Sequence, residues 1–124
     1  MSEIDRIIPI LVYEDIAAGH DFLVEAFGFT SGGVHRDAEG KPVHAEVRAC
    51  DVVIWLHRVA AELNLVSPRS MSAASSGLVV QVKDVDGHCE RARAHGAHLE
   101  SEPQDMPYGQ REYGSGCGGT SVVV

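Results

Sequence analysis

The pattern of apolar and polar residues in the first half of the chain predicts a strand, a helix and three more strands. Asp15 occupies an N-cap position, and the apolar residues after it, including Phe22 and Phe27, recur at helical spacing as far as Gly28. Runs rich in β-branched and alternating polar residues lie on either side of this helix. The strands are expected at residues 6–13, 29–35, 43–48 and 52–57, with Pro9 at a strand start or a sheet edge.

The same order of elements begins again after a serine-rich loop at residues 59–76. A strand is expected at residues 77–83, and Asp84 caps a helix that stops at Gly96. Two more strands are expected to begin at residues 97 and 110. We interpret residues 1–124 as one α+β domain of two tandem β-α-β-β-β modules, module one at about 4–58 and module two at about 77–124.

The sequence PYGQREYG at residues 107–114 contains candidate ligand-binding side chains. A turn at Tyr108 leads into a strand whose alternation places Arg111 and Tyr113 on one face. A guanidinium fork and two phenol rings are side chains that hold an aromatic or anionic small molecule in a pocket. The alternative is a solvated edge strand. The opposite face of the strand would carry Gln110 and Glu112.

Trp55, the only tryptophan, is a further candidate ligand-binding residue. It lies in an apolar run, so it either packs in the core or forms a stacking wall of a cavity. The sequence leaves both interpretations open.

The seven histidines raise the question of a metal site. His44 and Glu46 share one face of a predicted strand, and His57 lies on the next strand, so these three could form a weak site. The other candidates are expected on solvated outer surfaces of the helices or just beyond them: His20, His88, His95 and His98.

Composition and charge limit the range of partners and functions that the protein can have. The chain has 124 residues, 44% of them hydrophobic, and a net charge of −8 without a basic run, which argues against nucleic acid and anionic membranes as partners. The apolar run at residues 7–12 is too short for a secretion signal or a membrane span, so we expect a cytoplasmic protein. Three cysteines without short spacing indicate reduced thiols.

The duplicated unit resembles a known superfamily. The strings IIPILVYEDIAAGHDFLVEAFGF, PVHAEVRACDVVIWLH and LVVQVKDVDGHCERARAHGAHLESEPQDMPYGQREYG are similar to the vicinal oxygen chelate superfamily. The resemblance is closest to its small glyoxalase and bleomycin-resistance proteins. It implies two modules that curve around a cavity, usually completed as a homodimer.

The resemblance also bears on cofactors. In metal-dependent members, His, Gln or Glu ligands come from the first strand, from the strand that opens the second half and from late strands. Here the first two positions fall near Pro9 and Gly77, which offer no side-chain ligand. The chain therefore resembles metal-free members that bind drugs or metabolites, and we expect no cofactor. The alternative is a metal-dependent lyase, isomerase or dioxygenase-type enzyme, with a divalent metal on His44, Glu46 and His57.

The end of the sequence departs from the family pattern. Members with PYGQREYG normally continue through an Asp-Pro-Glu-Gly-His type turn into an aromatic final strand, whereas this chain reads SGCGGTSVVV from Ser115. A changed reading frame and a shortened end both fit this sequence. We expect a shortened or altered last strand, with a possible stub at residues 122–124. The exposed sheet edge would favour a homodimer. A third alternative is that no small-molecule function survives.

Overall fold

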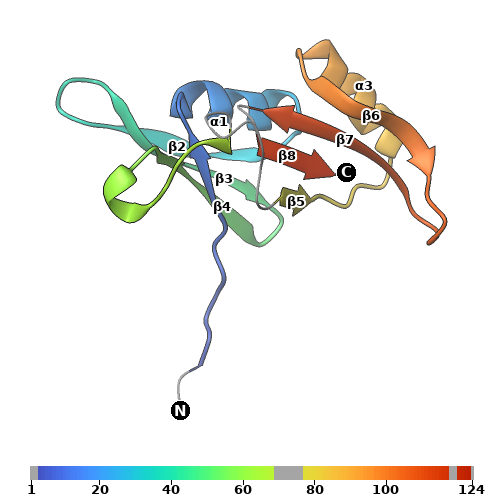
Figure 1. Ribbon diagram of the computed structural model, residues 1–124, viewed down its shortest axis with the longest axis horizontal. Helices are drawn as coiled ribbons and strands as arrows, with labels where there is room; N and C mark the ends of the chain where they lie inside the picture. The colour runs from blue at the N-terminus through green and yellow to red at the C-terminus, as the bar shows by residue number, and fades with distance from the viewer. Residues whose placement is uncertain (1–2, 69–76, 118–119, 124) are drawn as a thin grey trace.

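The computed structural model describes residues 3–68, 77–117 and 120–123, with side chains as far as Ser115. It contains two four-stranded sheets, each with one helix (Figure 1). Module one consists of β1 (Ile10–Tyr13), α1 (Ile16–Glu25), β2 (Thr30–Arg36), β3 (Pro42–Ala49) and β4 (Val52–Arg58). A short 3-10 helix, η1 (Ala61–Leu63), follows. Module two consists of β5 (Gly77–Val79), α3 (Val85–Ala94), β6 (His98–Asp105), β7 (Arg111–Cys117) and β8 (Thr120–Val123).

The two sheets have the same topology. Their strand orders are β1-β4-β3-β2 and β5-β8-β7-β6, so the last strand of each module lies between its first and third strands. The pairs β1–β4 and β5–β8 are parallel, and the other neighbours are antiparallel. The predicted α+β class and the repeated β-α-β-β-β order are confirmed.

The start and stop signals of the two helices are equivalent. Asp15 accepts a hydrogen bond from the Ala18 backbone at 3.0 Å, and Asp84 accepts one from Gly87 at 2.9 Å. Each bond satisfies a backbone N–H that has no partner within the first helical turn. After the helices the chain turns through a glycine with φ of +84°, a conformation that glycine adopts without the steric cost of a β-carbon.

Module one has a continuous apolar core between α1 and its sheet. Leu23 of α1 packs with Val47 of β3 and with Ile54 and Leu56 of β4, all buried. Because side chains alternate along a strand, Trp55 points away from this core, to the open face of the sheet. Alternation thus builds both the core and the exposed face of module one.

His88 and Arg91 of α3 join module two to module one. The His88 Nε2–H donates to the Phe27 carbonyl at 2.9 Å, and Nδ1 accepts from the Tyr113 hydroxyl at 2.7 Å. Arg91 Nε donates to the Glu25 carbonyl at the end of α1 at 2.9 Å. Burial lowers the pKa of His88. The prediction of a solvated His88 was wrong, because this side of α3 faces module one.

The expectation for His20 was also wrong. Its ring is buried between α1 and β2, where Nε2 lies 2.7 Å from the Ser31 hydroxyl and Nδ1 lies 2.9 Å from the Asp21 carboxylate. The amphipathic pattern of the helix could not show that Ser31 would supply a partner. His95 and His98 are exposed, as predicted.

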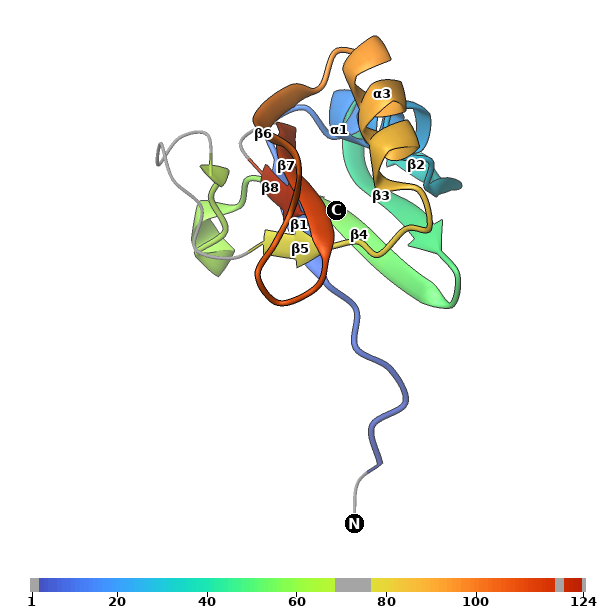
Figure 2. The same cartoon turned by 90° about the vertical axis from the view of Figure 1, so that its right-hand side faces the viewer.

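The first strand begins later than expected, at Ile10. Residues 3–9 form an extended segment, here called the arm, that leaves the body of the molecule (Figures 1 and 2). The Trp55 N–H donates to the Pro9 carbonyl at 3.0 Å, which fixes the base of the arm. Ile4 and Ile7 are 83% and 78% exposed. The arm thus holds apolar side chains outside both sheets.

In module two, β5 and β8 are short. β5 has three residues where seven were expected, and β8 has four where β4 has seven. The prediction of a shortened last strand is confirmed for the described residues; Val124 of the expected stub and residues 69–76 of the loop lie outside them. Cys50 and Cys89 are free thiols. No described helix combines the length and the apolar character that crossing a bilayer requires.

Candidate functional site

The open face of the module-one sheet gathers aromatic and charged side chains. Register places His35 opposite His44, His44 opposite His57, and Glu46 opposite Trp55 across strands β2, β3 and β4. Directly opposed residues on one face of an antiparallel pair have β-carbons about 4.5–5.5 Å apart, so their side chains interact. The register therefore creates one row of three imidazoles and a neighbouring carboxylate–indole pair.

The Trp55 indole is held in place by an ionised network. Its Nε1–H donates to Glu46 Oε1 at 3.2 Å, and Glu46 Oε2 accepts from Arg48 Nε at 3.1 Å and Nη2 at 2.9 Å. The hydrogen bonds from Arg48 lower the pKa of Glu46, so its carboxylate is charged. Gly32 of β2 makes room for it, because a β-carbon there would lie 2.7 Å from Glu46 Oε2.

The imidazole row extends the aromatic surface beside the indole. The centroid of the His44 ring lies 5.4 Å from that of the Trp55 ring, in an edge-to-face arrangement, and 5.7 Å from that of the His35 ring. Burial lowers the pKa of His44, and the neighbouring His35 and His57 lower it further. His44 is therefore neutral at pH 7 and presents a flat, polarisable edge next to the indole.

A hollow of about 420 Å³ opens beside this face. Trp55 is 37% exposed at its wall, so a planar molecule can reach one side of the indole. The residues around the hollow are Arg6, Glu46, Arg48, Cys50, Asp51, Val53 and Trp55. The structure thus places Trp55 at an accessible surface, not in the core.

Two residues of the alternative metal-ligand set, Glu46 and His57, have other partners in this structure. His57 Nδ1–H donates to the Arg58 carbonyl at 2.8 Å, and Glu46 is occupied by Arg48 and Trp55. In the part of the chain that the structure describes, no three His, Cys, Asp or Glu side chains converge as metal ligands. His44, Glu46 and His57 share a face without forming a chelating group.

The other predicted ligand-binding residues lie in module two and do not adjoin Trp55. Tyr113 is fully buried under α3 with its hydroxyl on His88, and burial raises its pKa. Arg111 also faces α3, where it pairs with Asp86 at 3.0 Å, and it pairs with Asp105 at the end of β6 at 3.3 Å. The exposed Tyr108 donates to Glu112. The structure therefore does not gather these residues with Trp55 into one site.

Two further hollows adjoin module two. One, of about 370 Å³, is lined by Val79, Val80, Gln81, Val82, Val85, Gln110, Arg111 and Glu112. The other, of about 530 Å³, is mainly apolar and lies between β5 and the β3–β4 end of module one, with Ile54 and Val80 among its walls. The candidate site residues predicted from the sequence did not include His35, Arg48 or Glu112. Strand alternation was the available signal for Glu112, whereas His35 needed the β2–β3 register.

Proteins of known sequence or structure resemble the chain over most of its length. An uncharacterised protein of Mycobacterium tuberculosis is 29% identical over 106 residues, which span 83% of this chain but only 62% of that protein. The crystal structure of TioX from Micromonospora sp. ML1 matches with 28% identity and a TM-score of 0.74, covering 96% of this chain and 95% of TioX.

Two other crystal structures share the fold at lower identity. A bleomycin-binding protein from Streptomyces verticillus, complexed with copper(II)-bleomycin, is 23% identical with a TM-score of 0.65, covering 99% of this chain and 96% of that one. A glyoxalase-related enzyme from Clostridium phytofermentans is 14% identical with a TM-score of 0.71, covering 98% and 94%. The family model of the Glyoxalase/Bleomycin resistance protein/Dioxygenase superfamily matches residues 3–116, and the chain belongs to this superfamily.

Proposed function

We propose that this protein binds a small, planar molecule, such as an antibiotic or an aromatic metabolite, without a metal. The observation that carries the proposal is the exposed Trp55 indole, held by Glu46 beside the hollow of about 420 Å³. An indole fixed before binding loses little conformational freedom when a ligand stacks on it. The proposed site is the open face of module one.

The chemistry of this face suits an aromatic ligand. Offset stacking or edge-to-face contact between rings contributes about 0.5–1.5 kcal/mol beyond the area buried. Trp55 and His44 offer two such rings, while Glu46 and Arg48 supply polar contacts at the rim. The bleomycin-binding protein with this fold supports the ligand class without identifying the ligand.

A thermal-shift screen tests the proposal with bleomycin and with planar aromatic antibiotics. A ligand at one hundred times its dissociation constant stabilises the folded state by about 2.7 kcal/mol. We expect Trp55→Ala to remove the shift while the unliganded melting temperature stays nearly unchanged. Arg111→Ala is the matched variant for the module-two residues Tyr108, Arg111 and Tyr113. A shift lost in Arg111→Ala but kept in Trp55→Ala would place the ligand in module two.

The second candidate is a metal-dependent lyase, isomerase or dioxygenase-type enzyme. The glyoxalase-related enzyme with the same fold favours it. Protein purified without chelator and analysed for metals separates the two functions. A stoichiometric divalent metal that is lost in His44→Ala would replace the binding proposal with the enzyme. Activity on glutathione conjugates would then identify the reaction class.

A further inference from the structure

A serine, a histidine and an aspartate of module one are joined by hydrogen bonds. The Nε2 atom of His20 in α1 lies 2.7 Å from Ser31 Oγ of β2, and its Nδ1 atom lies 2.9 Å from Asp21 Oδ1. An ionised carboxylate only accepts hydrogen bonds, so the ring proton is on Nδ1, which donates to Asp21. Nε2 is then the acceptor, and the Ser31 hydroxyl donates to it. The three side chains are thus in the order carboxylate, imidazole, hydroxyl.

Ser31 is accessible, whereas His20 is shielded. Ser31 is an exposed residue of β2, the outer strand of the module-one sheet, and His20 is only 8% exposed. The Gly33 N–H also donates to Ser31 Oγ at 3.1 Å, and a β-carbon at Gly33 would meet no atom within 4 Å. A reactant can therefore approach the hydroxyl, and the Gly33 N–H can stabilise negative charge on its oxygen as the proton leaves. Ser31 opposes the buried Val47, so it lies on the helix side of the sheet, on the opposite face from Trp55.

Module two shows that the fold does not need this polar pair. His20 and Cys89 each lie five residues after their N-cap aspartates. Ser31 and Leu99 each lie at a register shift in the outer strand of their sheet. Cys89 belongs to the buried core, and Leu99 packs against that core. Weakly polar and apolar side chains therefore serve at these positions in module two, and the imidazole–hydroxyl pair is particular to module one.

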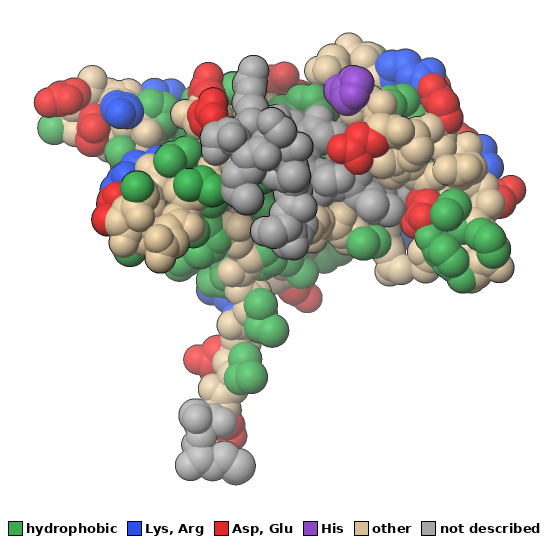
Figure 3. All heavy atoms as spheres, viewed as in Figure 1, with side chains coloured by type: hydrophobic (Ala, Val, Ile, Leu, Met, Phe, Trp, Pro, Cys, Tyr) green, Lys and Arg blue, Asp and Glu red, His purple; other side chains and the backbone are tan. Residues whose placement is uncertain are grey.

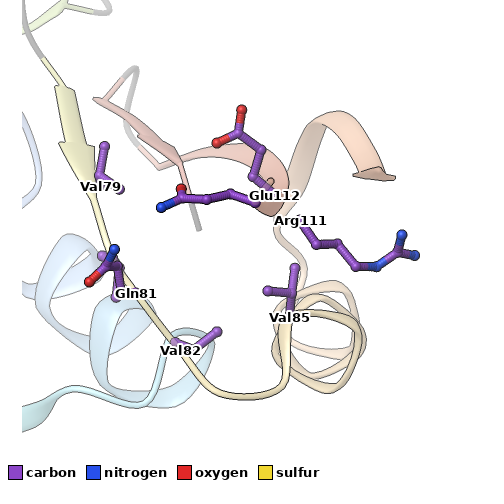
Figure 4. Close-up of a pocket in the computed structure, with 8 residues that line it drawn as sticks. Val79, Gln81, Val82, Val85, Arg111 and Glu112 are labelled. Atoms are coloured by element: carbon purple, nitrogen blue, oxygen red, sulfur yellow. The ribbon is translucent and has the colours of Figure 1, made fainter. Parts of the chain in front are cut away.

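Module two offers no equivalent accessible hydroxyl at its hollow or in its core. Figure 4 shows Gln81, Arg111 and Glu112 around the hollow of about 370 Å³, and the described residues that line it include neither a serine nor a histidine. A second described hydroxyl, that of Tyr113, lies 2.7 Å from His88 Nδ1, but Tyr113 is fully buried. An electrophile from solvent can therefore reach the hydroxyl of module one but not that of Tyr113.

The charge of the surface favours an uncharged reactant. The chain has a net charge of −8, and Figure 3 shows Asp and Glu side chains over both modules. Asp21 lies directly beside the site. Anionic reactants such as acyl phosphates would be repelled. Ser31 does not line any of the three hollows described above, so the reactant has to be small and activated by its own leaving group.

We propose that Ser31 is a nucleophile for small, neutral, activated esters, with His20 as its general base and Asp21 as a positioning residue. Ser31 Oγ forms a bond to the ester carbonyl carbon as its proton passes to His20 Nε2. The bond from that carbon to the leaving oxygen breaks, the oxygen keeps the electron pair, and His20 returns the proton to it. Water then cleaves the acyl-serine in the same way, so one ester and one water give one acid and one alcohol. This activity is independent of the proposed binding function.

Reaction with p-nitrophenyl acetate tests the proposal on the full chain. Release of p-nitrophenolate gives the rate, and mass spectrometry of peptides locates the acetyl group. Wild type is expected to carry the acetyl group on Ser31 during the reaction. Ser31→Ala should lose the acetylated peptide and lower the rate at least about tenfold. Thr30→Ala is the matched control, because Thr30 is the preceding exposed hydroxyl residue of β2, and it should react like wild type.

Asp21→Ala tests the positioning role without changing the nucleophile. Asp21 is exposed, so the melting temperature should stay nearly unchanged while the rate falls about tenfold. NMR of the imidazole nitrogens gives a readout that packing alone would not move: the His20 proton should be on Nδ1 in wild type and should shift toward Nε2 in Asp21→Ala. An acetyl group found only on amines, an unchanged rate in Ser31→Ala, a wild-type ring with its proton on Nε2, or a wild-type rate no higher than that of free imidazole at the same concentration would overturn the proposal.

Discussion

Module one and module two share strand order, cap geometry and stop glycines, but they differ in how much apolar surface they bury. In module one, α1 and the strands β1, β3 and β4 contribute to a continuous buried core, and β2 adds the partly buried Val34. In module two, α3 and its sheet have few buried residues among those whose burial is described, namely Cys89, Ala92, Tyr113, Gly114 and Ser115. Local signals such as an N-cap aspartate act within a few residues, so they can build the same backbone in both modules. Core formation also needs a full-length central strand, which β4 supplies and the described part of β8 does not.

The test with the largest expected effect compares two leucine-to-alanine substitutions, one in each module. Leu56→Ala in the buried core of module one should lower the free energy of unfolding by about 3–4 kcal/mol. Leu99→Ala removes the same atoms from β6, where the side chain is only partly buried, so its effect should be about half as large. Urea denaturation measures both. Equal losses would mean that the two cores are equally packed.

The connection between the modules is the next test. His88→Ala removes two hydrogen bonds and leaves the Tyr113 hydroxyl and the Phe27 carbonyl without this partner. We expect a loss of about 2–3 kcal/mol in the free energy of unfolding. A double-mutant cycle with Tyr113→Phe isolates the His88–Tyr113 bond. Additive effects in that cycle would contradict the coupling between these side chains.

The two N-caps should respond alike. Asp15→Ala and Asp84→Ala each remove one hydrogen bond to the first turn of a helix, which costs about 1 kcal/mol. Melting temperatures of the two variants should fall by similar amounts. A much larger drop for one cap would show that the helices depend on their start signals to different degrees, against the shared local pattern.

The smallest expected effect is on the pH dependence of stability. The folded-state pKa values of His44 and His88 lie below the ordinary 6.5, so the unfolded chain binds protons first as pH falls. The contribution of these two neutral histidines to the free energy of unfolding is fully present above pH 6.5 and is lost progressively below it. Urea midpoints between pH 7.5 and pH 5 should therefore decrease, and less steeply in His88→Gln. An unchanged slope in that variant would exclude His88 as a contributor.

Sequence reasoning predicted the fold well because its signals were local or repeated. Asp15 and Asp84 located the helix starts, and alternation separated the two faces of β3 and β4. The site was harder to predict, because it depends on which elements lie next to each other. Nothing in the sequence around Tyr113 shows that His88 of α3 covers its ring, and nothing around Arg111 shows that Asp86 and Asp105 pair with it.

The proposed binding site is tested most directly by the fluorescence of Trp55, the only tryptophan in the chain. Titration with a ligand that gives a thermal shift should change the Trp55 emission saturably, with the dissociation constant found by calorimetry. Glu46→Gln removes the ion pair with Arg48 and should weaken binding about tenfold, while Arg111→Ala should bind like wild type. Calorimetric binding with unchanged Trp55 emission would contradict a ligand site on the open face of module one.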